Sequence, residues 1–361
     1  MRIRTNQLKE GCILAADIKS LTNHPIVPKK TVISHKNLDI IKAFLVKDVQ
    51  VEPILVNGDP FKPNEIIKDD SEEAIQADDV IKPMSSLYLK AVQDYKKLFK
   101  GWQANVSIDM PAVRTIVVPI IEAALETPRD IFSLYHYSTK EDYLYHHAIT
   151  LAALSAVLGK VLNFSKGDCI QIGIAGAMCD CGMAKIDPKI LNKKESLSKH
   201  EFDEVKKHPI YSFTMLEQVK ILKDDVRKTV YQHHERIDGS GYPNGLTAEY
   251  IHPFAKIIAV SDVYHAMTSE RNYRGKQSPF KVLESILQDQ FGKFDPRVVN
   301  ALTKVMTNFS SGTRVLLSNN EVGEIVFIEQ KYPTRPMIKL ESTGEIIQLI
   351  QNRQLFIEEV L

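Results

Sequence analysis

The central half of the chain, from about residue 128 to 308, carries its apolar residues mostly at helical spacing. Two long amphipathic stretches, SSLYLKAVQDYKKLFKGW and PAVRTIVVPIIEAALE, precede it and also predict helices. The polar segments NKKES and IDGSGYPNG predict loops, and the spacing of Ser198 and Glu201 indicates a capping box that begins a helix. The pattern therefore predicts an all-helical central domain.

Both ends of the chain instead show short β-branched runs. At the N-terminus, LKEGCILAADI, HPIVPKKTVI and DVQVEPILV surround the helical stretch LDIIKAFL. After residue 312, alternating runs from RVLL to LFIEEV predict a small β-barrel of about five strands. We therefore predict a multidomain protein with an N-terminal α+β module (1–60), an acidic linker and connecting helices (61–127), a helical domain (128–308) and a C-terminal β-barrel-like module (309–361).

The composition is that of an ordinary globular protein, 44% hydrophobic and 25% charged, with a net charge of +1. A non-specific nucleic-acid binder carries a basic excess, so we expect no nucleic-acid partner. The N-terminal apolar stretch is too short for a signal peptide, and the run at 115–125 is too short to cross a bilayer, which takes roughly 20 apolar residues. We therefore expect a cytoplasmic protein with reduced Cys12, Cys169, Cys179 and Cys181.

Nine of the 11 histidines fall in the helical region, which indicates a site there. In KDDVRKTVYQHHERIDG, Val226 and Val230 set an inward helix face, and His233 and His234 follow closely enough that both can face inward. Each buried imidazole needs partners for its ring nitrogens. A metal ion satisfies both rings, so for this pair we favour a metal site over simple packing.

Three other polar residues allow two interpretations when each is taken alone. His147 shares an apolar stripe with leucines, and a core histidine bonded to a backbone carbonyl is the simpler interpretation. His208 lies next to Pro209 near a helix end, where we expect a solvent-exposed histidine. Asp262 lies on an apolar stripe, where a carboxylate needs an arginine or a cation, and we favour the cation.

Asp180 lies in the segment GAMCDCG, after small residues that let another backbone come close. One carboxylate can bridge two metal ions through its two oxygens, and imidazole with carboxylate suits Fe, Mn or Zn. Two such ions at roughly 3.5–4 Å stabilise the attacking and leaving oxygens of a phosphoryl displacement. From residue types alone we predict metal-dependent phosphoryl chemistry at Asp180.

The segment HHERIDGSGYPNGL at 233–246 resembles the signature of HD-GYP domains, a branch of the HD metal-dependent phosphohydrolases. The resemblance covers about residues 128–305 and continues in YLYHHAITLAALS, the CDCG segment, KILNKKESLSKHEFDEVKKHP, IHPFAKIIAVSDVYHAMTSERNYR and FGKFDPRVV. Such domains are all-helical and are known for hydrolysing the bacterial second messenger cyclic di-GMP to linear pGpG or GMP. The resemblance therefore implies an HD-GYP domain at 128–308.

The resemblance also implies a two-metal site, with Fe or Mn as the expected ions and Zn as an alternative. The ligands of the first metal would be His147, Cys179, Asp180 and Asp262. The ligands of the second would be Asp180, His208, His233 and His234, with Asp180 as the bridge and the catalytic residue. Some members carry a glutamate for a third metal where this chain has Tyr143, so two ions are the expected maximum.

For the substrate, a cyclic dinucleotide, the resemblance implies phosphate contacts from Arg271 and Arg274, because the forked guanidinium fits phosphate oxygens. A solvated surface charge is the alternative for both arginines. Gly241 and Tyr242, in the glycine-rich loop at 239–245, would border the pocket. The same loop also fits a helix C-cap followed by a turn.

Two residues depart from the family pattern. Cys179 replaces the histidine of the His-Asp pair, and Met183 replaces the lysine that follows. Methionine cannot offset phosphate charge or protonate a leaving oxygen, and a preorganised donor is worth about 2.7–4 kcal/mol, or about a hundredfold to a thousandfold in rate. Cysteine either ligates Zn or Fe as a thiolate or lies as a small buried hydrophobe beside a weak or missing first metal.

Three functions stay open on this basis. We favour a slow or altered phosphodiesterase acting on cyclic di-GMP. The first alternative is a degenerate domain that binds cyclic di-GMP without hydrolysing it, or that binds a protein partner through the GYP loop or the flanking modules. The second alternative is a phosphohydrolase for another nucleotide. A homodimer is compatible with each, and no membrane partner is expected.

Overall fold

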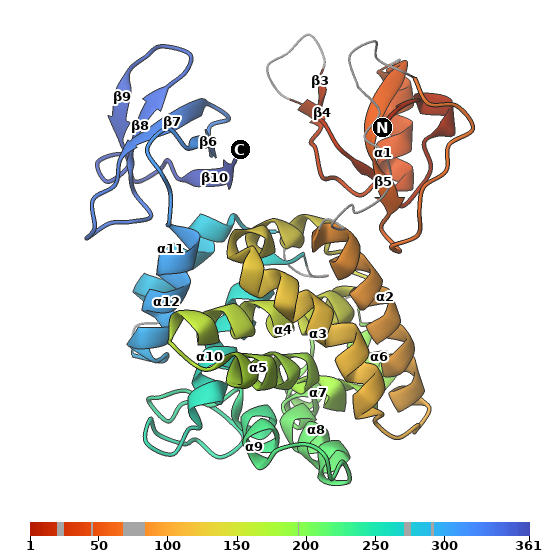
Figure 1. Ribbon diagram of the computed structural model, residues 1–361, viewed down its shortest axis with the longest axis vertical. Coiled ribbons are helices and arrows are strands. Elements are labelled where there is room, and N and C mark those ends of the chain that lie inside the picture. The colour runs from red at the N-terminus through yellow and green to blue at the C-terminus, as the bar shows by residue number, and fades with distance from the viewer. Residues whose placement is uncertain (20–24, 45, 68–83, 194, 271–275, 290–291) are drawn as a thin grey trace. The chain divides into compact units, whose positions relative to one another are not determined.

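The computed structural model describes residues 1–19, 25–44, 46–67, 84–193, 195–270, 276–289 and 292–361 (Figure 1). These residues form two compact units, Met1–Asp94 and Tyr95–Leu361, and the boundary falls inside helix α2 (Met84–Gln103). Most of the predicted acidic linker, residues 68–83, lies outside the described residues. The division into four segments stays a prediction.

The first unit contains the expected small α+β region. Its strands and helices are β1 (Arg2–Arg4), the 3₁₀ helix η1 (Thr5–Gln7), β2 (Cys12–Leu14), β3 (Ile18–Lys19), β4 (Pro25–Val27), α1 (His35–Ala43) and β5 (Asp48–Leu55). The sheet order is β1-β5-β2 with antiparallel pairs, and β3 pairs with β4. Ile3, Leu14, Ile41 and Val51 lie in its core, which α1 closes on one side.

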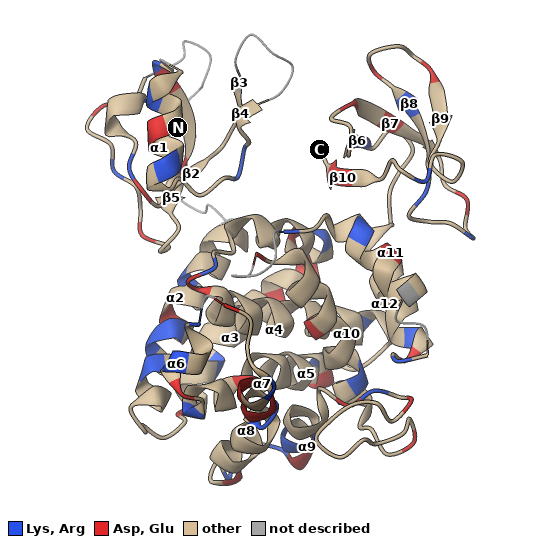
Figure 2. Cartoon of the chain, turned by 180° about the vertical axis from the view of Figure 1, so that it is seen from behind, with Lys and Arg blue, Asp and Glu red and all other residues tan. Residues whose placement is uncertain are grey.

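The second unit is mostly helical, as the sequence predicts. Its helices are α3 (Met110–Glu126), η2 (Pro128–Tyr137), α4 (Tyr143–Val161), α5 (Lys166–Met178), η3 (Cys181–Lys185), α6 (Pro188–Leu191), α7 (Lys199–Val205), α8 (His208–Glu217), α9 (Asp224–Gln232), α10 (Pro253–Thr268), α11 (Pro279–Asp289) and α12 (Pro296–Met306). The predicted capping box is confirmed at the start of α7, where Ser198 and Glu201 exchange hydrogen bonds. Figure 2 shows acidic and basic residues interspersed along these helices, in keeping with the net charge.

Helix α4 is the centre of this unit. Every residue from His146 to Gly159 is buried, because α3, α5 and α10 all pack on it. By length and composition α4 could also cross a membrane, but 78% of its apolar window is buried inside the protein, as in the core helix of a globular domain.

Helices α4 and α5 pack with their backbones in close contact. A Cβ at Gly176 would lie 2.8 Å from the carbonyl oxygen of Leu151, and one at Gly173 would lie 2.8 Å from that of Ala152. This confirms the expectation that small residues in α5 admit another backbone. Because α5 ends two residues before Asp180, this packing fixes where that carboxylate emerges.

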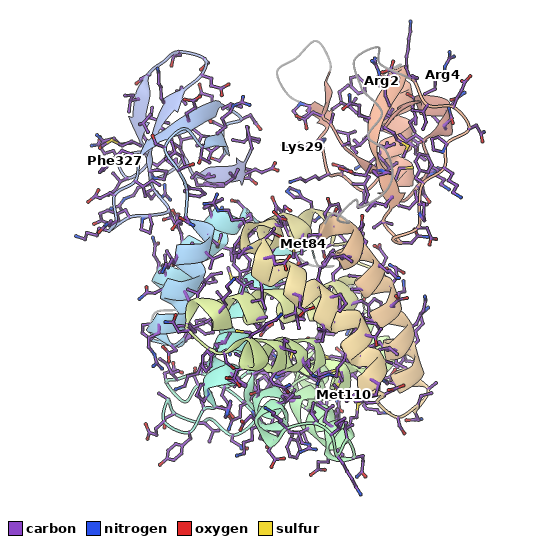
Figure 3. The ribbon with its side chains drawn as sticks, in the orientation of Figure 1. Arg2, Arg4, Lys29, Met84, Met110 and Phe327 are labelled. Carbon is purple, nitrogen blue, oxygen red and sulfur yellow. The ribbon has the colours of Figure 1, made fainter. Side chains whose placement is uncertain are left out.

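The C-terminal residues form a five-stranded antiparallel sheet in the order β10-β6-β7-β8-β9. Its strands are β6 (Arg314–Leu317), β7 (Val322–Phe327), β8 (Met337–Leu340), β9 (Ile346–Gln348) and β10 (Ile357–Val360). Phe327 projects from β7 into solvent (Figure 3) and is 57% exposed. The ladder runs between edge strands β9 and β10 without a described pairing of the two, so closure into a barrel stays a prediction.

We predict that Gly176→Ala destabilises the protein by about 1–3 kcal/mol, because the new methyl group must push α5 away from α4. Gly167→Ala, in the first turn of the same helix, is the matched control. Its Cβ meets nothing closer than 3.8 Å, so the change should be neutral or stabilising by up to about 1 kcal/mol. Urea unfolding of both variants measures the difference, and equal stability would contradict the close packing.

Candidate metal centre

The turn that carries Asp180 is held by α8. The Ser212 hydroxyl donates to the carbonyl of Cys179 at 2.7 Å and accepts from the backbone N–H of Gly182 at 2.7 Å. Gly182 lies so close to the backbone of His208 and Ser212 that no Cβ fits there. The turn after α5 therefore places Asp180 beside the first residue of α8, His208.

The two oxygens of Asp180 face different histidines. Oδ1 lies 3.1 Å from Nε2 of His208 and 3.6 Å from Nε2 of His233, whereas Oδ2 lies 3.4 Å from Nε2 of His147. The Asp180 residue is only 8% exposed. This geometry fits a bridging carboxylate, and the bridging role of Asp180 stays a prediction.

Asp262, on α10, is placed in the same way. Its Oδ1 lies 3.2 Å from Nε2 of His147 and its Oδ2 lies 3.3 Å from Nδ1 of His234. Both aspartates therefore connect His147 to the other histidines. One ligand atom from each of four residues lies within 4.8 Å of all the others, and the four are Asp180, His208, His233 and His234.

The hydrogen bonds of His208 and His233 favour a cation in this cluster. Their Nδ1 atoms lie 2.7 Å from the carbonyl oxygens of Val205 and Val230, and a carbonyl can only accept, so each Nδ1 carries the hydrogen. In neutral rings the Nε2 atoms are then acceptors, yet they lie 3.1 Å apart beside Asp180 Oδ1. Three acceptors that converge without a donor fit a divalent metal ion.

The protonation states agree with this donor set. Burial raises the pKa of Asp180, but the neighbouring His208 and His233 outweigh burial and hold the pKa well below the usual range. For Asp262, burial is likewise outweighed, by His234 and His147, and the pKa is lowered. Burial and the neighbouring His233 lower the pKa of His234. Ionised carboxylates and neutral imidazoles are the forms that bind metals.

Cys179 lies next to the cluster as a buried thiol. Its Sγ donates to the carbonyl of Gly176 at 3.1 Å, and its side chain is fully buried. Burial, with the charges of Asp180 and Asp262, raises the pKa of the thiol well above its usual value. This geometry favours a neutral thiol, and ligation by Cys179 stays a prediction.

His208 differs from the expectation that it is exposed. It is 1% exposed, because it begins α8 instead of ending α7, and Pro209 takes the first helical turn where its missing N–H costs nothing. His147 is buried as expected, at 3% exposure. Its Nδ1, however, lies against a histidine and a tyrosine instead of the expected carbonyl.

The GYP loop borders the cluster. The ring of Tyr242 stacks on His234 at 4.6 Å between centroids. Gly241 touches the backbone of Glu235 and Arg236 so closely that a Cβ would clash. Glu235, which is 2% exposed, holds the loop by accepting from the backbone N–H groups of Asn244 and Leu246 at 2.8 Å each. The two predicted phosphate ligands, Arg271 and Arg274, lie outside the described residues.

Sequence reasoning missed the contacts of three residues at this site. His265 contacts Nδ1 of His147 at 2.8 Å, and the Tyr143 hydroxyl contacts the same atom at 3.2 Å. Lys206 places its ammonium group 5.6 Å from the centre of the Tyr242 ring, at the edge of the cluster. Helical spacing was the available signal, since His265 follows Asp262 by three residues and Tyr143 precedes His147 by four.

Comparison with known proteins agrees with this geometry. Residues 134–298 match the family model of the HD domain. The cyclic di-GMP phosphodiesterase PA4108 of Pseudomonas aeruginosa is 27% identical over 94% of this chain and 84% of its own length. The cyclic di-GMP phosphodiesterase PdeB of Borreliella burgdorferi is 25% identical over 92% and 86%. The 3'3'-cGAMP-specific phosphodiesterase 3 of Vibrio cholerae is 27% identical over 52% and 41%.

Residues 134–298, which include the buried His/Asp cluster, thus match the HD domain family. The GYP sequence at 241–243 and the two similar proteins that span nearly the whole chain extend this similarity, and the chain resembles the HD-GYP proteins.

We predict that Asp180→Ala removes most of the bound metal, because it takes an oxygen from each of the two histidine groups. The loss in affinity should exceed the roughly tenfold to hundredfold effect of removing an outer-shell partner. Asp180→Asn, which keeps the shape, should lose metal as well, whereas Asp203→Ala, on the exposed side of α7, should retain it. Metal analysis of the purified variants gives the answer, and full retention in both Asp180 variants would show that this residue is no bridge.

Proposed function

We propose that this protein is a metal-dependent phosphodiesterase that hydrolyses a cyclic dinucleotide, with cyclic di-GMP as its first candidate substrate. The observation that carries the proposal is the pair of buried carboxylates, Asp180 facing three histidines and Asp262 facing two. Support comes from two relatives named cyclic di-GMP phosphodiesterases that match more than nine-tenths of the chain.

His147, Asp180 and Asp262 would hold one divalent ion, and Asp180, His208, His233 and His234 would hold a second. Fe or Mn is the expected metal and Zn the alternative. Such an ion pair stabilises the charge on the attacking and leaving oxygens of a phosphoryl displacement. Asp180, which belongs to both ligand sets, would set the distance between the two ions. Tyr242 stacks on His234 and so borders the cluster on that side.

The substrate contacts are fewer than the family pattern implies. Met183 lies half-buried in η3 and carries no charge. Lys185 does not replace the missing lysine, because its ammonium donates to the carbonyl of Trp102 at 3.1 Å and to Oδ1 of Asn105 at 2.7 Å. We therefore propose slow turnover, with Arg271 and Arg274 as the phosphate ligands.

One observation favours the alternative of a receptor without turnover. The Cys179 thiol bonds to Gly176, which leaves the first metal with fewer strong ligands than the second. A hydrolase for another nucleotide is the third candidate, and a cGAMP-specific relative supports a mixed cyclic dinucleotide in particular.

The cellular compartment and the protein partners are also proposals. All four cysteines are free and buried, which supports a reducing compartment such as the cytoplasm. Protein partners, including a second copy of the chain, would meet the GYP loop or the flanking modules. Exposed Tyr250 (67%), which follows that loop, and Phe327 (57%) support such contacts.

The proposal is tested on protein purified without oxygen, by measuring metal content and cyclic di-GMP turnover on the same sample. We expect two metal ions per chain and measurable hydrolysis with Fe, Mn or Zn. Tight binding of cyclic di-GMP that is recovered intact would establish the receptor instead. Hydrolysis of another nucleotide in a substrate panel, without action on cyclic di-GMP, would establish the third function.

We further predict that Cys179→His together with Met183→Lys increases turnover by about a hundredfold or more, because a histidine ligand and a phosphate-facing cation are both restored. The variant Cys179→His with Met183→Leu restores the histidine without the cation, so it measures the effect of the metal ligand alone. Melting temperatures show whether the larger side chain is accommodated at this buried position. An unchanged rate in a folded, metal-loaded double variant would refute this explanation of slow turnover.

A further inference from the structure

The ring of His147 lies between two different hydrogen-bonding environments. Its Nε2 faces acceptors, 3.4 Å from Asp180 Oδ2 and 3.2 Å from Asp262 Oδ1. Its Nδ1 lies 2.8 Å from Nδ1 of His265 and 3.2 Å from the Tyr143 hydroxyl. His147 and His265 are both almost completely buried, so the protein itself determines where their hydrogens lie.

Two neutral imidazole nitrogens 2.8 Å apart share one hydrogen, so one ring donates and the other accepts. If Nε2 of His147 binds a cation, its Nδ1 must carry the hydrogen and His265 must accept it. Nε2 of His265 then carries a hydrogen of its own, and it lies 3.1 Å from the buried hydroxyl of Ser269. Each ring nitrogen of His147 and His265 therefore has a hydrogen-bond or metal partner in this arrangement.

We infer that His265 is a positioning residue that selects the metal-binding tautomer of His147. The inference rests on the metal site of the proposed function, not on the identity of the substrate. Asp262 and His265 lie one turn apart on the same face of α10, and Ser269, the C-cap residue of this helix, follows His265 by four residues. Helix α10 and its C-cap residue thus supply an aspartate of the cluster, the residue that orients His147, and the hydroxyl that orients His265.

The same pair has a second arrangement that suits the metal-free protein. Nε2–H of His147 can then donate to Asp180 and Asp262, and its Nδ1 accepts from Nδ1–H of His265. Between the two arrangements, His147 moves a hydrogen from Nε2 to Nδ1, and His265 moves one from Nδ1 to Nε2. Each ring stays neutral, so the exchange neither takes up nor releases a proton overall.

His208 and His233 have no such freedom. Their Nδ1–H groups donate to the carbonyls of Val205 and Val230 at helix ends, which fixes the tautomer with or without a metal. Metal binding should therefore change the tautomers of His147 and His265 and leave those of His208 and His233 unchanged. His265 would respond although it touches no metal.

The test uses the full chain, Zn²⁺ as a diamagnetic probe, and NMR of ¹⁵N-labelled histidine rings before and after loading. We expect His147 and His265 to exchange tautomers on loading, while His208 and His233 keep theirs. A His265 ring that keeps its metal-free tautomer while His147 changes would overturn the inference. A protein that binds no Zn²⁺ would overturn it as well.

Variants give a second, independent readout in Zn²⁺ affinity. His265→Leu removes the hydrogen-bond acceptor of His147 and should lower the affinity for one of the two Zn²⁺ ions by about tenfold to a hundredfold. His265→Asn places an amide oxygen near the lost Nδ1 and should recover most of the affinity. His252→Asn, at the other end of α10 where asparagine is a good N-cap, is the control and should bind like the wild type.

Unchanged binding of two ions by His265→Leu would refute the positioning role, even in a protein that hydrolyses cyclic di-GMP. Conversely, a wild-type protein that shows the tautomer exchange but hydrolyses no nucleotide would refute the proposed function and leave the inference standing. The two failures are therefore distinguishable.

Discussion

The helical unit is organised around two ionised aspartates in its interior. Burying a carboxylate is costly unless it is paired with hydrogen bonds or a cation. Asp180 and Asp262 meet this cost by sharing four histidines, which come from α4, the start of α8 and the end of α9. The packing of these helices therefore depends on the ionised aspartates, because the same side chains that join the helices also compensate the buried charge.

Helix ends supply much of the order in this arrangement. Val205 is the last residue of α7 and Val230 lies in the last turn of α9, so their carbonyls lack helical partners and accept from histidines. Glycines then bring the turn and α8 together, most closely at Gly182. The ligand atoms are thus oriented by the backbone, which is harder to perturb than a side-chain network.

Much of this could be predicted from the sequence, because helical spacing states which residues share a face. The inward orientation of His233 and of Asp262, and the helical centre of the chain, followed from that spacing alone. His208 was misjudged because its burial depends on Gly182, which is 26 residues away in sequence and belongs to another element. The direction of the Cys179 thiol and the contact between His147 and His265 likewise depend on tertiary packing, which spacing does not encode.

The two halves of the cluster, His147 with Asp262 and Asp180 with His208, His233 and His234, differ in how firmly their histidine tautomers are fixed. His208 and His233 are fixed by backbone carbonyls and face Asp180 together, whereas His147 relies on a neighbouring histidine whose hydrogens can rearrange. The less rigid half also borders Cys179, which is held as a buried thiol. On the inference above, a cation bound by His147 and Asp262 would require a tautomer exchange and would have no histidine at position 179, whereas the rings of His208 and His233 are already oriented toward Asp180. Since phosphoryl displacement needs charge stabilisation at both oxygens, the proposed function requires that this weaker half also hold a cation.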